Sequence, residues 1–139
     1  MSKSVQCFLP TPPPNVTHND LKAFVTYVNG RAMAKIRKSD RLKAEEDRLR
    51  PYIAKIRPSE PLSGKLRETV KVVWPTNGEH EQGEPKETKP DADNVIKTFN
   101  DLLESCHVIE NDAMVCDLRV QKMYGDPAGI WVRVEEIED

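Results

Sequence analysis

The chain has 139 residues and nearly balanced charge, with 21 Lys and Arg against 23 Asp and Glu and a net charge of −2. It contains no run of about 18 apolar residues and begins without a long apolar stretch, which excludes a transmembrane helix and predicts no secretory signal. Three widely spaced cysteines, Cys7, Cys106 and Cys116, form no Cys-x-x-Cys pair. This argues against a disulfide framework and a thiolate zinc site, and it favours a reduced cytoplasm.

The small net charge hides two halves of opposite sign. Residues 1–75 carry 15 Lys and Arg and 7 Asp and Glu, a balance of +8, whereas residues 76–139 carry 6 and 16, a balance of −10. The cations are densest between Arg31 and Arg57. This asymmetry indicates an anionic partner on one side and clustered carboxylates on the other, and two solvated surfaces of opposite sign are the plainer alternative.

The first elements in the chain are a strand and a proline-rich segment. Residues 5–9 are apolar and stop at Pro10, which predicts an opening strand. Residues 11–15 hold three prolines, so they are expected to be an extended, exposed loop. Residues 18–30 show no clear period, and we expect a flexible loop near residues 10–30.

A basic strand and helix are expected next. Residues 31–37 alternate weakly and favour a strand. Ser39 is a suitable N-cap for a basic helix that runs toward Arg57, and Pro51 is expected to kink or split that helix.

The second half has clearer periodicity. Residues 66–74 alternate as a strand, and residues 75–89 are polar and rich in Gly and Pro, which predicts a second flexible loop. Residues 91–106 place their apolar side chains on one stripe of a helix. Residues 114–123 and 130–134 alternate as strands and are expected to form a hairpin. We therefore predict a single domain over residues 1–139, of α/β or α+β class, with a mixed sheet packed against helices.

Carboxylates gather where the acidic loop enters the predicted helix. Asp91 and Asp93 are separated by one residue, Lys97 lies one turn further on the same polar face, and Asp112 follows the helix in a turn. Carboxylate oxygens suit Mg²⁺, and such ions can polarise a phosphodiester and activate water. A nearby lysine can stabilise charge in the transition state or assist proton transfer.

Plainer readings of the same residues exist. Aspartate is favoured at helix starts by capping and by the helix dipole, and Asp93 with Lys97 is also an ordinary i,i+4 ion pair. Metal-dependent glycosyltransferases use an Asp-x-Asp motif as well, although 139 residues are too few for a nucleotide-sugar domain.

The segment from Lys89 to Lys122 closely resembles the signature of RusA-type Holliday junction resolvases. Asp91, Asp93, Asn94 and Lys97 match the family's Asp-x-Asp-Asn and lysine, and Asn111-Asp112 matches its acidic pair with Asn at the first position. The resemblance implies a homodimeric, Mg²⁺-dependent endodeoxyribonuclease that resolves four-way DNA junctions by paired nicks, with Mn²⁺ as a substitute ion. It implies metal-binding roles for Asp91, Asp93 and Asp112, and catalytic roles for these three residues and Lys97.

The resemblance also implies how DNA is held and where the protein works. Phosphate contacts are expected from the basic region and from the family's strand lysine, namely Arg31, Lys35, Arg37, Lys38, Arg41 and Lys122. Such proteins are commonly encoded by prophages, so a bacterial or phage-infected cytoplasm is the expected location. A non-catalytic protein that keeps the fold and binds branched DNA is the alternative.

Three aromatic residues complete the expectations. Trp131 is expected on the outer side of its strand, with a dimer contact as the first interpretation. Phe24 and Tyr27 are expected to pack in the core, and insertion into the centre of a DNA junction is the alternative.

Overall fold

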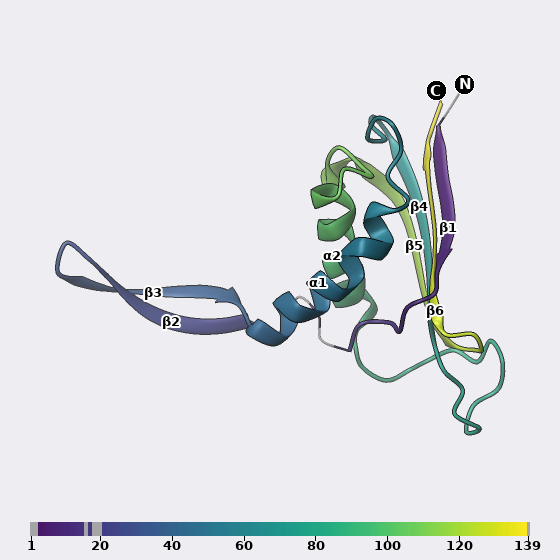
Figure 1. Cartoon of the computed structure of the whole chain (residues 1–139), viewed down its shortest axis with the longest axis horizontal. Coiled ribbons are helices and arrows are strands. Elements are labelled where there is room, and N and C mark those ends of the chain that lie inside the picture. Colours follow the sequence, from purple (N-terminus) through teal and green to yellow (C-terminus); the bar gives the residue numbers. More distant parts are fainter. Residues whose placement is uncertain (1–2, 16, 18–20, 139) are drawn as a thin grey trace.

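A computed structural model describes residues 3–15, 17 and 21–138. The body has two layers, a four-stranded sheet and two helices that cover one of its faces (Figure 1). The strand order is β1-β6-β4-β5, and only the β4–β5 pair is parallel. The elements of the body are β1 Ser4–Leu9, α1 Asp40–Ala54, β4 Leu66–Trp74, α2 Ala92–Ser105, a 3₁₀ turn Asp112–Met114, β5 Val115–Tyr124 and β6 Gly129–Glu136. This confirms the predicted α+β domain with a mixed sheet.

Strand β4 is an inner strand of the sheet, and its buried side is apolar except at Glu68. Val70 and Val72 are fully buried under the helices, and Trp74 is buried at the strand's end. Val132 and Val134 of β6 extend the same layer, and Phe99 and Leu103 of α2 pack onto it.

The predicted hairpin between the last two strands is wrong. Strand β5 pairs with β4 in parallel, whereas β6 lies on the other side of β4 and runs antiparallel to it. The short loop between the two strands therefore passes across the end of β4. Strand alternation shows which face of a strand is buried, but it does not show which strand lies beside it.

Helix α1 begins as predicted. The Ser39 side chain accepts a hydrogen bond from the Leu42 backbone N–H at 3.0 Å. The helix ends at Ala54, earlier than expected, and it continues through Pro51 without being split. Leu42, Leu49 and Ile53 are fully buried, and this burial on both sides of the proline holds the helix together.

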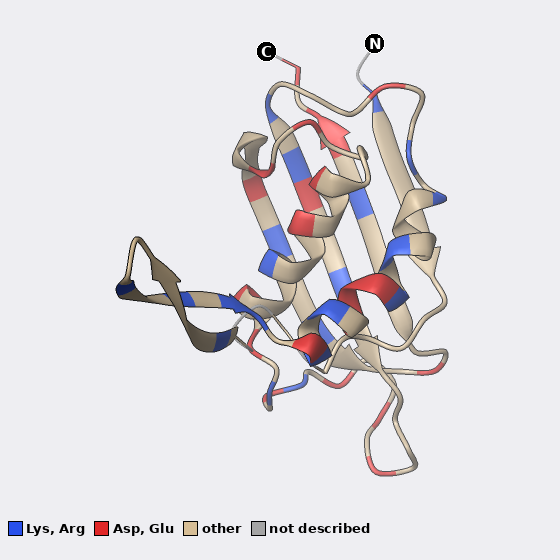
Figure 2. Ribbon diagram, turned by 60° about the vertical axis from the view of Figure 1, so that its left-hand side comes forward, with Lys and Arg blue, Asp and Glu red and all other residues tan. Residues whose placement is uncertain are grey.

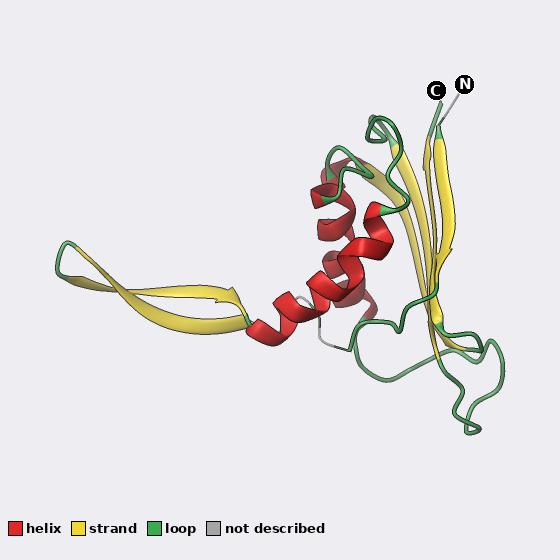
Figure 3. Ribbon diagram, viewed as in Figure 1, coloured by secondary structure: helices red, strands yellow, loops and turns green. Residues whose placement is uncertain are grey.

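In the first part of the chain, the observed structure differs most from the predicted one over residues 21–38. Strands β2 (Leu21–Val28) and β3 (Arg31–Lys38) pair in a separate two-stranded sheet, which we call the arm. The arm extends away from the body (Figure 3). Asn29 and Gly30 both have positive φ, at 53° and 77°, as a two-residue hairpin turn requires. The strand over 31–37 is confirmed, whereas 21–28 is a strand and not the expected loop. Residues 18–20 lie outside the described part of the chain.

The proline-rich segment is more buried than predicted. Thr11 is 2% exposed, and Pro13 and Pro14 are buried too. Arg48 of α1 donates hydrogen bonds to the Thr11 hydroxyl and, at 2.8 Å, to the Pro12 carbonyl, which holds the segment against the helix.

The loop over residues 75–89 is fastened to the outer edge of β5. The backbone N–H groups of Gly83 and Lys86 donate to the carbonyls of Tyr124 and Lys122 at 2.8 and 3.0 Å, and Tyr124 donates back to Glu84 at 2.9 Å. The segment that was expected to be flexible thus covers the last residues of a sheet edge, 122–124, which would otherwise be unpaired. Among the described residues, no helix is both long and apolar enough to cross a membrane.

Candidate functional site

Helix α2 positions the first two carboxylates. Its apolar side packs into the core through Val95, Ile96 and Phe99, so its polar side faces away from the sheet. Asp91 is the N-cap residue and Asp93 lies in the first turn, and both are exposed. The Asp91 side chain makes no capping hydrogen bond. Capping therefore does not account for the Asp91 carboxylate, and the positive end of the helix dipole favours both negative charges there.

Lys122 fastens the loop that leads into Asp91. Its Nζ atom, near the end of β5, donates to the backbone carbonyls of Thr88 and Pro90 at 2.6 and 2.8 Å. The lysine thus ties the sheet to the residue directly before the N-cap. Its predicted DNA contact stays a prediction, and the structure assigns it a positioning role that the sequence pattern did not reveal.

Lys97 forms ion pairs away from the start of the helix. Its Nζ atom lies 3.4 Å from Asp101 Oδ1 and 3.8 Å from Asp112 Oδ2. Among the described residues, Asp93 and Lys97 do not form the ordinary i,i+4 ion pair, because the lysine side chain is directed toward the other end of α2. The structure thus brings Lys97 and Asp112 together.

Asp112 lies at the opposite end of α2 from the first two carboxylates. Its backbone N–H donates to Glu104 Oε1 at 2.8 Å, so it is level with the last turn of the helix. A helix rises about 1.5 Å per residue, so the stretch from Asp93 to Glu104 spans roughly 16 Å. The following strand does run back beside the helix, but Asp112 precedes it, and Lys122 is the residue that reaches the Asp91 end.

The fit of this arrangement to a divalent metal ion is partial. Aspartate oxygens are the ligands that Mg²⁺ prefers. Within the described ranges, however, no group of three or more His, Cys, Asp and Glu side chains lies close enough to hold a metal ion. One chain therefore supplies two exposed carboxylates at the start of α2 and the half-buried Asp112 beyond its other end, and the three-carboxylate site stays a prediction.

A further carboxyl group, missed in the sequence, lies under α2. Glu68 occupies the buried side of β4 and is 1% exposed, and neither of its carboxyl oxygens has a hydrogen-bond partner. Burial raises the pKa of Glu68 to about 7, and the nearby Asn100 amide of α2 opposes part of that rise without completing a hydrogen bond of ordinary geometry. Its place in the alternation of 66–74 was the available signal, because Glu68 falls between Leu66 and Val70.

Apart from Lys122 of β5, the predicted DNA-binding cations are divided between the arm and α1. Arg31, Lys35 and Arg37 are exposed on β3, where Figure 2 shows cations along the arm. Lys38 has a partner, because its Nζ atom lies 2.8 Å from Oε2 of the buried Glu46. Arg41 is exposed in the first turn of α1. Three exposed cations on one strand can follow a line of phosphates, whereas Lys38 holds the arm to the body.

The aromatic predictions have mixed outcomes. Phe24 and Tyr27 do not pack in the core, since they lie on the arm and are 38% and 74% exposed. Trp131 lies on the outer face of the sheet as expected, with Lys71 Nζ 5.1 Å from the centre of its ring. Its dimer contact stays a prediction.

Comparison with known proteins agrees with this arrangement. The family model described as Endodeoxyribonuclease RusA matches residues 13–135. A search of curated proteins finds no significant match. The matched range contains the arm, both helices, and the carboxylates and lysine of α2.

Proposed function

Because the chain belongs to the RusA family of endodeoxyribonucleases, which act on Holliday junctions, we propose that it resolves four-way DNA junctions by paired, Mg²⁺-dependent nicks. Branched DNA is the substrate class of this family. We further propose that it works as a homodimer in the cytoplasm of a bacterium or a phage-infected host. Two active sites related by two-fold symmetry can nick two strands of a junction symmetrically.

The observation that carries the proposal is the pair of exposed carboxylates at the start of α2. Asp91 and Asp93 are held at a helix N-terminus, and Lys122 fixes the loop before them. We assign metal-binding roles to Asp91, Asp93 and Asp112, with Mn²⁺ as a substitute for Mg²⁺. Because Asp112 lies at the other end of α2, it would not share an ion with Asp91 and Asp93 of the same chain in this conformation. When bound, the ion would polarise the scissile phosphate and lower the pKa of a water molecule. Its remaining ligands would come from water, the phosphate or a second chain.

Lys97 contributes charge beside the reacting phosphate. Its ammonium group is half-exposed and neutralises Asp101 and Asp112 in the free protein. A phosphate that approaches α2 can take over one of these pairings, and the lysine then stabilises the charge that develops on the phosphoryl oxygens. The lysine is therefore assigned to catalysis and the exposed cations of the arm to binding.

A junction-cleavage assay with a matched pair of variants tests this function. Asp93→Asn removes a carboxylate from the first turn of α2, and Asp40→Asn removes one from the first turn of α1. With Mg²⁺ and a synthetic four-way junction, the wild type and Asp40→Asn cut with paired nicks. Asp93→Asn is expected to lose cleavage on the order of 10²-fold or more, with binding unchanged.

The alternative function predicts a different result in the same assay. A non-catalytic protein that keeps this fold would bind the junction without Mg²⁺, and neither the wild type nor either variant would cut it. Absence of cleavage by a wild type that binds the junction would therefore reject the proposed function.

A further inference from the structure

The arm carries most of the exposed apolar surface of the described residues. Nine large apolar side chains are exposed among the described residues, and seven of them belong to the arm. The other two are Phe8 and Leu118. A two-stranded hairpin without other support is marginally stable in water. An exposed apolar surface of this kind indicates a binding partner.

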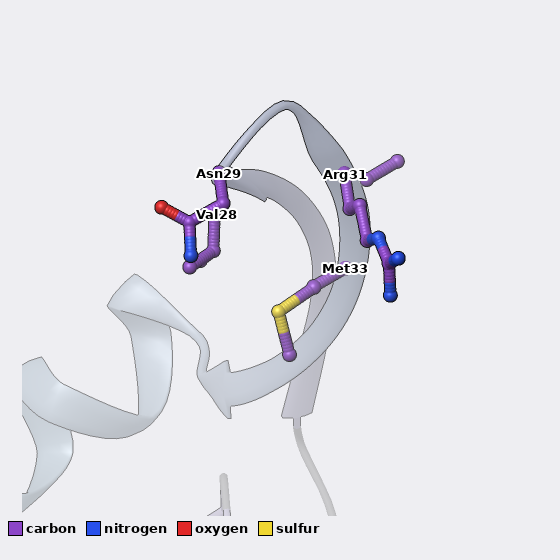
Figure 4. A pocket seen from close by; sticks show the side chains of 5 residues that line it. Val28, Asn29, Arg31 and Met33 are labelled. Atoms are coloured by element: carbon purple, nitrogen blue, oxygen red, sulfur yellow. The ribbon is translucent and has the colours of Figure 1, made fainter.

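The register of the arm separates its side chains into two unlike faces. Residues that pair directly across the two strands lie on the same face. One face carries four cations together with Phe24, Thr26, Val28 and Met33, and its cations are Lys22, Arg31, Lys35 and Arg37. At the tip of the arm, this face forms a shallow concavity lined by Val28, Arg31 and Met33 among others (Figure 4). The cationic face therefore suits an anionic partner.

The other face is apolar over nearly its full length, and we call it the apolar face. Its members are Leu21, Ala23, Val25, Tyr27, Ala32, Ala34 and Ile36, and the one cation in the same register, Lys38, is paired with Glu46 at the base. Tyr27 and Ile36 are 74% and 72% exposed, which is more than any large apolar side chain of the cationic face. Nothing in the described part of the chain covers this surface.

We propose that the apolar face is covered by the same face of a second copy of this chain. The proposal rests on the homodimer put forward above and assigns it an interface. Elsewhere on the described surface, the two remaining exposed apolar side chains lie on different strands, β1 and β5, so no second apolar face of this size exists to receive the arm.

Charge and area favour this pairing. When two apolar faces meet around a two-fold axis, the cationic faces of both arms point outward, so like charges are not buried against each other. Specific interfaces bury about 1,000 Å² or more in total, and the apolar face offers an extended surface for this, since it runs along both strands with Leu21, Val25, Tyr27 and Ile36 all exposed. The two outward faces would then present cations to DNA on both sides of the paired arms.

Sedimentation equilibrium of the full chain, without DNA or metal ions, tests the interface. The comparison is between Ile36→Lys on the apolar face and Met33→Lys on the cationic face of the same strand. Both side chains are exposed, so neither change disturbs the core of the body, and circular dichroism checks that both variants fold. We expect the wild type to have twice the 15.8 kDa mass of the chain. Ile36→Lys should weaken its association at least tenfold, and Met33→Lys should leave it within about threefold.

Three results would overturn the inference: a monomeric wild type, a dimer that neither variant weakens, or a dimer that both weaken equally. An apolar face that meets DNA bases instead would leave the wild type monomeric in this assay. The junction assay is separate. A monomeric protein that cuts junctions would reject the interface but not the endonuclease activity. A dimer that Ile36→Lys dissociates but that never cuts junctions would reject the endonuclease activity but not the interface.

Discussion

Lys97 Nζ and Asp112 Oδ2 lie 3.8 Å apart, and this pair connects the middle of α2 to the turn that precedes β5. Both side chains remain accessible, with 52% and 34% of their surface exposed. A pair of this kind stabilises a fold by less than about 1 kcal/mol. Breaking this ion pair therefore costs little folding stability, so both side chains are free to take part in a reaction.

Replacing Lys97 is expected to separate catalysis from folding. Lys97→Met should lower the free energy of unfolding by no more than about 1 kcal/mol, because its ion pairs are half-exposed. Cleavage of a four-way junction should fall on the order of 10²-fold, since charge on the phosphoryl oxygens loses its neighbour. Urea unfolding and single-turnover cleavage measure the two effects, with Lys71→Met on the outer face of the sheet as the control. Unchanged turnover in Lys97→Met would remove this residue from the active site.

Two roles can be tested for Lys122: positioning of the loop before Asp91, and binding of a DNA phosphate. Lys122→Met removes two charge-assisted hydrogen bonds to backbone carbonyls, so the free energy of unfolding should fall by about 2 kcal/mol. A phosphate contact contributes about 0.9 to the slope of log binding constant against log salt concentration. We expect Lys122→Met to leave this slope unchanged. Lys35→Met on the arm should lower the slope by about 0.9 and leave the free energy of unfolding unchanged. A reduced slope in Lys122→Met would show that the ammonium group contacts DNA.

The ion pair between Lys38 and Glu46 is expected to be structural. Only 8% of the Glu46 side chain is exposed, so removing its partner leaves a carboxylate buried without a countercharge. Lys38→Met should therefore lower the free energy of unfolding by about 1–3 kcal/mol, and Glu46→Gln in the same background should recover part of the loss. Equal stability of Lys38→Met and the wild type would show that the pair contributes nothing to the attachment of the arm.

The candidate site was predictable from the sequence where it depends on one helix. Periodicity placed Asp93 and Lys97 on the polar side of α2, and the Pro90-Asp91 step marked its start. The position of Asp112 depends on where β5 begins relative to α2, which is a tertiary relationship that strand alternation does not contain. For the same reason, the hydrogen bonds from Lys122 to the loop before Asp91 could not be predicted, and its DNA contact stays a prediction.

The arm shows a signal that was present but not used. Asn29-Gly30 between two alternating segments is a strong hairpin signature, yet the apolar residues on either side of it also suited a core. Burial of Phe24 and Tyr27 was inferred from hydrophobicity alone, and a hairpin that leaves the body has no core to enter. Exposed apolar residues of this kind indicate an intermolecular surface, which a single chain cannot specify by its own periodicity.

The buried Glu68 makes stability depend on pH in an unusual direction. Its pKa is raised by burial to about 7 in the folded chain, above the value of 4.5 expected for a solvated glutamate. Between these values the folded state holds a proton that the unfolded state has lost, so the stability gained from the raised pKa falls as the pH increases through this window. The difference corresponds to about 3 kcal/mol between pH 4.5 and pH 7.

Glu68→Gln tests this dependence, because an amide does not titrate and keeps the shape of the protonated carboxyl group. The protonated form can also donate a hydrogen bond to Asn100 Oδ1, which lacks a partner in the described structure. We expect the variant to match the wild type near pH 5 and to exceed its free energy of unfolding by up to about 3 kcal/mol at pH 8. Glu87→Gln, at an exposed position, should change stability equally little at both values. A wild type whose stability relative to Glu68→Gln is the same at pH 5 and pH 8 would show that Glu68 does not change protonation in this window.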